Sequence, residues 1–387
     1  MNSVSRDQQI VFNSPPYTGN ELEYIKLAIQ NKKLCGDNYY SKLCESWFVD
    51  QFKCNKIMLT PSCTSALELA ALLIKIEPGD EVIMPSYTFV STANAFVLRG
   101  AKIKFVDINP TSMNIEPVLI EPAITVKTKA IVVVHYAGVS CDMELIMSIA
   151  NKHNLFVIED AAQAVMSKYN NQPLGTIGHL GCYSFHETKN YTSGGEGGAL
   201  LINDPQFNSR ADILREKGTD RSLFLKGQID KYSWRDIGSS FLPSELQSAF
   251  LYAQLLYAED INKQRNKIWN MYYTSLRSAV AEYGIETSEI QPGCDQNAHM
   301  FFLKFADIDE RSDYIRFMKK FNIQTSFHYV PLHSSPAGLK FGEFHGVDNY
   351  TSKESQRLVR IPLWYNLPEE DALYVIEKTL SYIESRG

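Results

Sequence analysis

The sequence predicts an α/β fold, in which a large domain with a mostly parallel sheet is followed by a smaller α+β domain. Two observations support this prediction. Up to Gly198, short apolar runs alternate with helical stretches, as expected for strands that are buried on both faces and separated by helices. After Gly198 the pattern changes and the chain becomes mainly helical. The length of 387 residues is sufficient for both domains.

Each predicted strand of the large domain is a short apolar run. These runs lie at 56–59, 81–84, 103–106, 130–134, 155–158, 182–185 and 199–202. Helical spacing of apolar residues or capping residues mark the segments around them. The predicted helices lie at 21–29, 41–52, 65–74, 91–98, 141–151 and 210–216.

A long helical stretch is expected to link the two domains. Apolar residues have helical spacing over 243–261, and we expect the helix to continue toward residue 274. The predicted large domain is therefore 1–274 and the small domain 275–387. The small domain is predicted to contain strands at 299–305 and 323–326 and helices at 311–321 and 369–384.

Composition describes an ordinary soluble globular protein. The net charge of −6 disfavours nucleic acid or an anionic membrane as a partner, and there is no apolar run long enough to span a membrane. Seven cysteines, with no Cys-x-x-Cys pair, indicate reduced thiols, so we expect a cytoplasmic protein.

A carboxylate and a lysine mark the predicted site. The buried run at 155–158 ends in Glu159 and Asp160, and Lys189 follows between an apolar strand and the glycine run Gly194–Gly198. A pyridoxal phosphate (PLP) site needs a lysine amine for the Schiff base and an acid that keeps the pyridine nitrogen protonated. Either signal alone is more often structural, because isolated lysines are usually solvated and glycine runs are usually turns. Their combination predicts a PLP site.

Two further segments at strand ends could contribute to this site. After the strand at 56–59, the amides of Cys63, Thr64 and Ser65 would open a helix and face an anion; the alternative is that Thr64 or Ser65 only caps the helix. After the strand at 81–84, Tyr87 and Phe89 could lie against a pyridine ring, although aromatic residues more often pack in the core.

Other kinds of site are disfavoured. The sequence has no Walker A loop, no His-Glu-x-x-His and no Gly-x-Gly-x-x-Gly after a strand. His328 and His333 lie near each other in sequence but lack a third ligand, so we expect no metal.

The motifs together resemble the DegT/StrS family of PLP-dependent sugar aminotransferases. The resemblance covers nearly the whole chain and is carried by several segments. They are Ser184-Phe-His-x-x-Lys189 with Gly195-Glu-Gly-Gly198, Glu159-Asp-Ala-Ala-Gln163, Ser62-Cys-Thr-Ser-Ala-Leu67, Pro85-x-x-Thr-Phe-Val-Ser-Thr-Ala93, His135-Tyr-Ala-Gly138 and Tyr329-x-Pro-Leu-His333. The segments His186–Tyr191 and Trp234–Ser240 are most similar to family members that make TDP-4-amino-4,6-dideoxygalactose for surface polysaccharides.

The resemblance implies the aspartate aminotransferase fold (PLP fold type I) and a homodimer with shared active sites. Lys189 would form the Schiff base with PLP and Asp160 would pair with the pyridine nitrogen. The remaining implied contacts are to the ring and the phosphate. Gln163 would lie near the ring hydroxyl, Phe89 would stack on the ring, and Ser184, Cys63 and Thr64 would hold the phosphate. Ser240 departs from the family, because many members have Asn at this position, which reaches the phosphate of the neighbouring subunit's cofactor. With Ser240 that contact would be shorter, water-mediated or absent.

The implied reaction moves the amino group of glutamate to C4 of a TDP-4-keto-6-deoxyhexose through PLP and its pyridoxamine form. Alternatives are the gluco epimer instead of the galacto product, an amino-acid aminotransferase or desulfurase, a nucleotide-sugar binding module and a non-catalytic regulator that retains the fold. A related sugar dehydratase would have His at the position of Lys189. Lys217 and Arg221 are candidates for contacts to the pyrophosphate.

Overall fold

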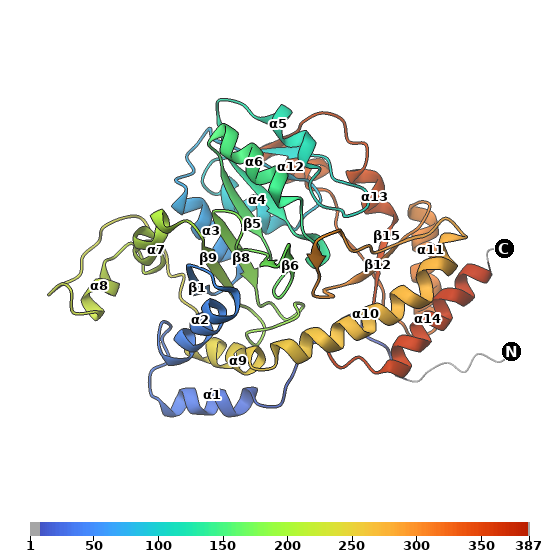
Figure 1. Ribbon diagram of the computed structural model, residues 1–387, viewed down its shortest axis with the longest axis horizontal. Helices are drawn as coiled ribbons and strands as arrows, with labels where there is room; N and C mark the ends of the chain where they lie inside the picture. Colours follow the sequence, from blue (N-terminus) through green and yellow to red (C-terminus); the bar gives the residue numbers. More distant parts are fainter. Residues whose placement is uncertain (1–7, 386–387) are drawn as a thin grey trace.

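The computed structural model describes residues 8–385 and contains a large eight-stranded sheet with helices on both faces (Figure 1). The strand order is β1-β9-β8-β5-β4-β2-β3-β14. The strands are β1 (Lys56–Thr60), β2 (Glu81–Pro85), β3 (Lys102–Val106), β4 (Thr128–Val134), β5 (Phe156–Asp160), β8 (Leu180–Ser184), β9 (Gly198–Ile202) and β14 (Gly342–Phe344). Only the pairs that include β9 are antiparallel, so the prediction of a mostly parallel sheet is confirmed.

The strands are apolar throughout because both faces of the sheet are covered. Successive residues of β5 enter different cores: Ile158 packs in the core beneath α3 (Cys63–Leu73) and α4 (Val90–Val97), whereas Val157 packs in the core with α6 (Met143–His153). The same alternation places the side chains of Glu159 and Asp160 on opposite faces of the sheet.

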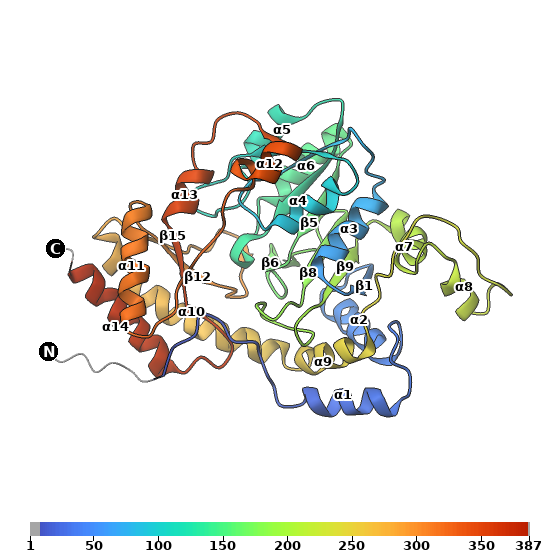
Figure 2. The same cartoon turned by 180° about the vertical axis from the view of Figure 1, so that it is seen from behind.

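A second sheet lies toward the C-terminal end of the chain. It has the order β10-β12-β15-β13 and is entirely antiparallel. Its strands are β10 (Glu286–Thr287), β12 (Phe301–Lys304), β13 (Ser326–Phe327) and β15 (Leu358–Ile361). One face packs on the helices α10 (Ala258–Ala281), α11 (Ile308–Lys320) and α14 (Glu369–Glu384), which enclose a separate core (Figures 1 and 2).

Two observations refine the predicted organisation. The expected long helix is divided, because α9 (Glu245–Leu255) ends before α10 begins, with Leu256 and Tyr257 between them. In addition, β14 comes from the C-terminal part of the chain but pairs with β3 in the large sheet. The domain boundary between residues 274 and 275 stays a prediction. Residues 1–7 of the predicted large domain and residues 386–387 of the predicted small domain lie outside the described residues.

The remaining elements surround the two sheets. They are α1 (Glu21–Gln30), α2 (Tyr39–Phe52), α5 (Ile120–Ala123), α7 (Asn208–Arg215), α8 (Arg221–Leu225), α12 (Pro336–Phe341), α13 (Thr351–Arg357) and a small sheet of β6 (Lys168–Tyr169), β7 (Gln172–Pro173) and β11 (Cys294–Asp295). In both views α8 projects from the end of the molecule opposite α11 and α14 (Figures 1 and 2). Within residues 8–385, no helix has the length and apolar character needed to cross a membrane.

Candidate active site

The carboxyl ends of β5 and β8 bring the predicted residues together. Asp160 is the last residue of β5 and Ser184 the last residue of β8, two adjacent parallel strands. Lys189 lies five residues beyond Ser184 (189 − 184) in the loop to β9. This edge is where open α/β sheets bind ligands.

Asp160 is a buried carboxylate with few hydrogen-bond donors. Its Oδ2 accepts a hydrogen bond from Thr92 Oγ1 at 2.7 Å, and its Oδ1 accepts one from the Ala162 amide at 3.2 Å. Burial raises the pKa of Asp160, although these bonds and the charge of Lys189 lower it. Such a carboxylate is suited to pair with a cationic group.

Lys189 is half-buried and lines a small pocket with Gln163 and Ser184. Burial lowers the pKa of Lys189, while Asp160 opposes that shift. Among the described residues, no ion pair of Lys189 is present. Its amine therefore stays available for a ligand in the pocket.

The N-terminus of α3 forms the second part of the site. Ser62 caps this helix, since its Oγ accepts a hydrogen bond from the Ser65 amide at 3.1 Å. The alternative that Thr64 or Ser65 caps the helix is therefore wrong, because the capping residue is Ser62. The Ser65 amide is already engaged in this bond. The amides of Cys63 and Thr64 are the ones left at this helix start for an anion.

A close backbone approach places this helix start against the strand ends. Gly198 pairs with Ser184 on one side and with Thr60 on the other. A Cβ atom at Gly198 would lie 2.3 Å from Ser62 C and 2.4 Å from Cys63 N, so only glycine fits there. Gly198 thus brings the start of α3 next to the end of β8, where Ser184 lies.

The aromatic residues after β2 have different environments. Tyr87 is fully buried and donates a hydrogen bond to the His328 carbonyl, and its hydroxyl lies 3.3 Å from Tyr136 Oη, so it is a core residue. Phe89 is 56% exposed and its ring lies 6.2 Å from that of Tyr329. Phe89 is therefore the aromatic of this segment that is free to contact a ligand.

Gln163 connects the pocket with the segment that follows β13. Its Oε1 accepts a hydrogen bond from the Ala137 amide at 2.7 Å, and its Nε2 donates to Tyr329 Oη at 3.2 Å. Both ends of the amide are fixed, so its position over the pocket is fixed as well.

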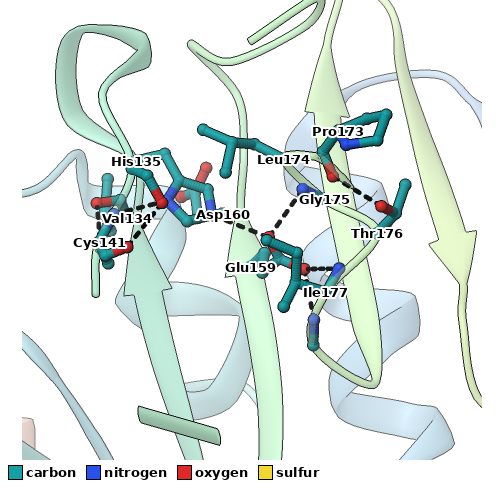
Figure 3. Close-up of polar contacts among 12 residues, drawn as sticks. Val134, His135, Cys141, Glu159, Asp160, Pro173, Leu174, Gly175, Thr176 and Ile177 are labelled. Carbon is teal, nitrogen blue, oxygen red and sulfur yellow. Dashed lines mark hydrogen bonds and ion pairs between the residues drawn. The ribbon is translucent and has the colours of Figure 1, made fainter. Parts of the chain in front are cut away.

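Glu159, next to Asp160, has the opposite kind of environment. Its carboxylate is fully buried and accepts hydrogen bonds from the amides of Gly175, Ile177 and Gly178 at 2.6–2.7 Å, and it lies 2.9 Å from His135 Nε2 (Figure 3). Since His135 Nδ1 accepts a hydrogen bond from the Cys141 amide, Nε2 carries the proton that is donated to Glu159. Glu159 is thus a structural residue that fixes the loop before β8.

Several other candidate residues do not join this cluster. Ser240 is exposed and forms an isolated antiparallel β-bridge with the backbone of Glu216. Lys217 and Arg221 both form ion pairs with the Glu216 side chain. Nδ1 of His333 lies 2.6 Å from Ser86 Oγ, and Nε2 of His333 lies 3.2 Å from Asp348 Oδ2. Over residues 8–385, no group of three His, Cys, Asp or Glu residues could hold a metal ion.

His299 lines the same pocket as Lys189 and was not predicted as a site residue. Asn190 Nδ2 donates to the Asn297 carbonyl, so its Oδ1 accepts the proton of His299 Nδ1 at 2.9 Å. Burial, followed by the charge of Lys189, lowers the pKa of His299 well below its ordinary value. The ring is therefore neutral, with an unprotonated Nε2. In the sequence, His299 only begins an apolar strand, a signal that does not reveal this arrangement.

Comparisons with known proteins identify the class to which this geometry belongs. The sequence profile of the DegT/DnrJ/EryC1/StrS aminotransferase family matches residues 17–380. The chain is 30% identical over 367 residues to GDP-perosamine synthase of Escherichia coli O157:H7, covering 94% of this chain and 95% of that protein. It is 33% identical over 320 residues to a "Pleiotropic regulatory protein" of Geobacillus stearothermophilus, covering 82% of both.

A solved structure shares the fold. The PLP-form of Spr1654 from Streptococcus pneumoniae superposes with a TM-score of 0.87 at 24% identity, covering 98% of this chain and 99% of that chain. The protein has PLP fold type I and is a PLP-dependent sugar aminotransferase. The chain belongs to the DegT/DnrJ/EryC1/StrS aminotransferase family.

Proposed function

We propose that this protein transfers the amino group of glutamate to C4 of a TDP-4-keto-6-deoxyhexose, giving TDP-4-amino-4,6-dideoxyhexose for surface polysaccharide synthesis. The galacto product is favoured by the resemblance of His186–Tyr191 and Trp234–Ser240 to enzymes that form it. The observation that carries the proposal is the grouping of Lys189, Asp160 and Ser184 at one sheet edge in a chain of this family.

The residues at this edge fit PLP. Asp160 is buried with a raised pKa and would hold the protonated ring nitrogen. Ser184 with the amides of Cys63 and Thr64 would hold the phosphate, and glycine at 198 allows the start of α3 to lie against the strand ends. When bound, PLP supplies an electron sink for the bonds at the amino-bearing carbon.

Gln163 and Phe89 would hold the two sides of the ring. Gln163 is fixed at both ends of its amide and would lie near the ring hydroxyl. Phe89, with its exposed ring, would stack on the cofactor.

Lys189 would carry the proton in both halves of the reaction. The lowered pKa of Lys189 increases the fraction of neutral amine at a given pH. Its Nζ would take the proton from Cα of glutamate and later deliver a proton to C4 of the sugar. A single lysine would approach the bound sugar from one face, so the face on which C4 is protonated would be fixed, and so would the axial or equatorial position of the amine.

The active protein is proposed to be a cytoplasmic homodimer with shared sites. In this arrangement Ser240 would approach the phosphate of the partner's cofactor, and Lys217 and Arg221 are candidates for the pyrophosphate. Arg221 begins α8, which projects from the body of the protein (Figure 2), and Lys217 lies in the connection between α7 and α8. A projecting segment is a geometry that suits contact with a second copy.

The test is to incubate the purified protein with glutamate and the TDP-4-ketosugar and to detect the amino sugar by mass spectrometry, with NMR coupling constants deciding between galacto and gluco products. K189A should abolish turnover, whereas K340A, which removes an exposed lysine of α12, should not. Retained amino transfer by K189A would remove the assignment of Lys189.

The same experiment separates the alternative functions. A regulator that only retains the fold, which the name of the Geobacillus relative brings into consideration, would give no amino sugar, and borohydride would not fix PLP to Lys189. An amino-acid aminotransferase would transfer the amine to 2-oxo acids but not to the sugar.

A further inference from the structure

His299 joins the segment that leads into β12 to the loop that carries Lys189. Its ring lines the same pocket as Lys189. The 2.9 Å hydrogen bond between His299 Nδ1 and Asn190 Oδ1 holds the ring against the residue that directly follows Lys189 in the chain. The position of the imidazole relative to the backbone of Lys189 is therefore fixed by one intervening side chain.

The backbone of His299 is held as firmly as its ring. Arg265 of α10 is buried, and its Nη2 donates a hydrogen bond to the His299 carbonyl at 2.7 Å. Its Nε donates to the carbonyl of Ala298 at 3.2 Å, and Ala298 has the left-handed backbone conformation with φ of 50°. Such a conformation persists only where the surrounding contacts impose it. The segment that presents the ring to the pocket is therefore fixed by α10.

Asn297 fixes the orientation of the Asn190 amide. Asn190 Nδ2 donates to the Asn297 carbonyl at 2.9 Å. Asn297 is itself held, because its Nδ2 donates to the carbonyls of Gln163 and Val165, each at 2.8 Å. The partner of one ring nitrogen decides which nitrogen of a histidine carries the proton. This network therefore keeps the proton of His299 on Nδ1 and leaves Nε2 as an acceptor.

This acceptor lies among cations. Within residues 8–385, no hydrogen bond of His299 Nε2 is present. Burial is the main cause that lowers the pKa of His299, followed by the charges of Lys189, Arg265 and Arg360. The neighbouring His328 also has a lowered pKa, through burial and then the charges of Arg360 and Lys189. A neutral acceptor in such surroundings suits a cationic N–H donor.

Lys189 is the cation that matches the free nitrogen. Arg265 is directed to backbone carbonyls by its hydrogen bonds. The Nη2 atom of Arg360 donates to Ser326 Oγ and to the Phe327 carbonyl, which direct the guanidinium to β13. Lys189 lines the pocket beside His299, has three donors on a flexible side chain, and has no ion pair in the part of the chain that the structure describes.

We propose that His299 is a positioning residue whose Nε2 accepts a hydrogen bond from the Lys189 ammonium whenever that amine is not bound to the cofactor. This proposal rests on the proposed function, in which Lys189 moves a proton in each half of the reaction. A fixed acceptor restricts a flexible side chain to the position from which the proton is transferred. Because the pKa of His299 is low, the proton stays on Nζ of Lys189 and remains available for the reaction.

The first test measures the hydrogen bond in the protein without cofactor. NMR of protein with 15N-labelled histidine reports the protonation and hydrogen bonding of each ring nitrogen, and H299Q, which lacks the signal, gives the assignment. We expect the His299 ring to be neutral, with its proton on Nδ1 and a hydrogen-bonded Nε2. K189M should shift the Nε2 signal to that of an unbonded acceptor and raise the pKa of His299, because a nearby positive charge is removed. K340M, at an exposed lysine of α12, should change neither.

The second test uses the PLP-loaded protein and glutamate alone, and follows the absorbance of the bound cofactor. H299L removes the acceptor, whereas H299Q keeps an acceptor oxygen. H153Q changes a histidine of α6 that pairs with Glu121 and serves as the control. We expect H299L to lower the maximal rate of conversion by about 10- to 100-fold, with the glutamate concentration for half-maximal rate within about 3-fold of the wild type. H299Q should lie between H299L and the wild type, and H153Q should equal the wild type.

Three results would overturn the inference. They are a His299 Nε2 signal that does not change in K189M, an unchanged maximal rate in folded H299L, and a loss confined to the glutamate concentration for half-maximal rate, which would assign His299 to the amino donor. Should H299L fail to fold, H299Q and the signal in K189M decide. Failure of the proposed sugar substrate is a different result, because neither measurement uses the sugar.

Discussion

Glu159 and Asp160 are adjacent acids at the end of one strand, yet their surroundings differ in every respect that matters for chemistry. Glu159 accepts three backbone hydrogen bonds and pairs with His135, so its charge is compensated within the protein (Figure 3). Asp160 has one hydroxyl donor and one amide donor, and burial raises its pKa. A saturated carboxylate holds structure, and an undersaturated one at a sheet edge is available for a ligand.

The difference follows from the alternation of side chains along β5. The face that Glu159 enters contains the loop 175–178, whose amides point at it, whereas the face that Asp160 enters contains α4, which offers the Thr92 hydroxyl. One face of the strand end is therefore closed by the backbone and the other is left open.

The largest expected effect comes from removing the charge of Asp160, on the open face of the strand end. D160N should lower the rate of amino transfer on the order of 10³-fold, because an amide cannot stabilise a protonated ring nitrogen in a buried site. Steady-state rates with glutamate and the ketosugar measure this. The folded protein should be at least as stable as the wild type without cofactor. If D160N kept more than about a tenth of the wild-type rate, Asp160 would not have the role assigned to it.

The matching substitution of Glu159, on the closed face of the strand end, should affect the stability of the fold instead of the rate. E159Q replaces one acceptor oxygen by a donor that faces backbone amides or His135, so we expect a loss of about 3 kcal/mol in the free energy of unfolding. Denaturant titration of wild type and E159Q measures it. The rate per folded molecule should stay within a factor of about 3 of the wild type. Normal stability with lost activity would reverse the two roles.

A third test follows from the raised pKa of Asp160, measured on the protein without cofactor. A raised pKa means that the folded state binds the proton more tightly than the unfolded chain. The resulting stabilisation is complete below the ordinary pKa of 3.8 and is lost as the pH rises through the raised value. The free energy of unfolding of the wild type, relative to D160N, should therefore fall as the pH increases above about 4 and then become constant. A difference that rises with pH over this range would mean that the carboxylate is already compensated.

Much of this arrangement could be predicted from the sequence, because it depends on local signals. The apolar runs predicted seven of the eight strands of the large sheet, all except β14. The position of an acid at one strand end and a lysine beyond the next predicted the candidate site residues. Residues whose role depends on distant partners were not found in this way. The partners of Glu159 come from a loop with no regular pattern, and His299 is defined by Asn190, which is 109 positions away.

Short strands were also missed. The run Leu358–Ile361 is four residues long and has a charge within it, so its pattern does not distinguish a strand from a loop. The break at Leu256 and Tyr257 between α9 and α10 leaves no mark in the sequence, because the apolar spacing continues across it. Both features depend on packing between segments that are far apart in the chain.

The smallest expected effect concerns Thr92, whose hydroxyl donates a hydrogen bond to Asp160. T92V removes the 2.7 Å bond to Asp160 Oδ2 and keeps the shape of the side chain. Because the Ala162 amide remains, we expect the rate of amino transfer to fall less than about tenfold. The pKa of Asp160 should rise further, since a bond to the charged form is lost. The pH range over which the free energy of unfolding falls, relative to D160N, should then be higher for T92V than for the wild type. T88V removes only the 2.7 Å contact between the hydroxyls of Thr88 and Thr92 and serves as the control. An unchanged pH range would show that the Thr92 hydroxyl does not contribute to the charge state of Asp160.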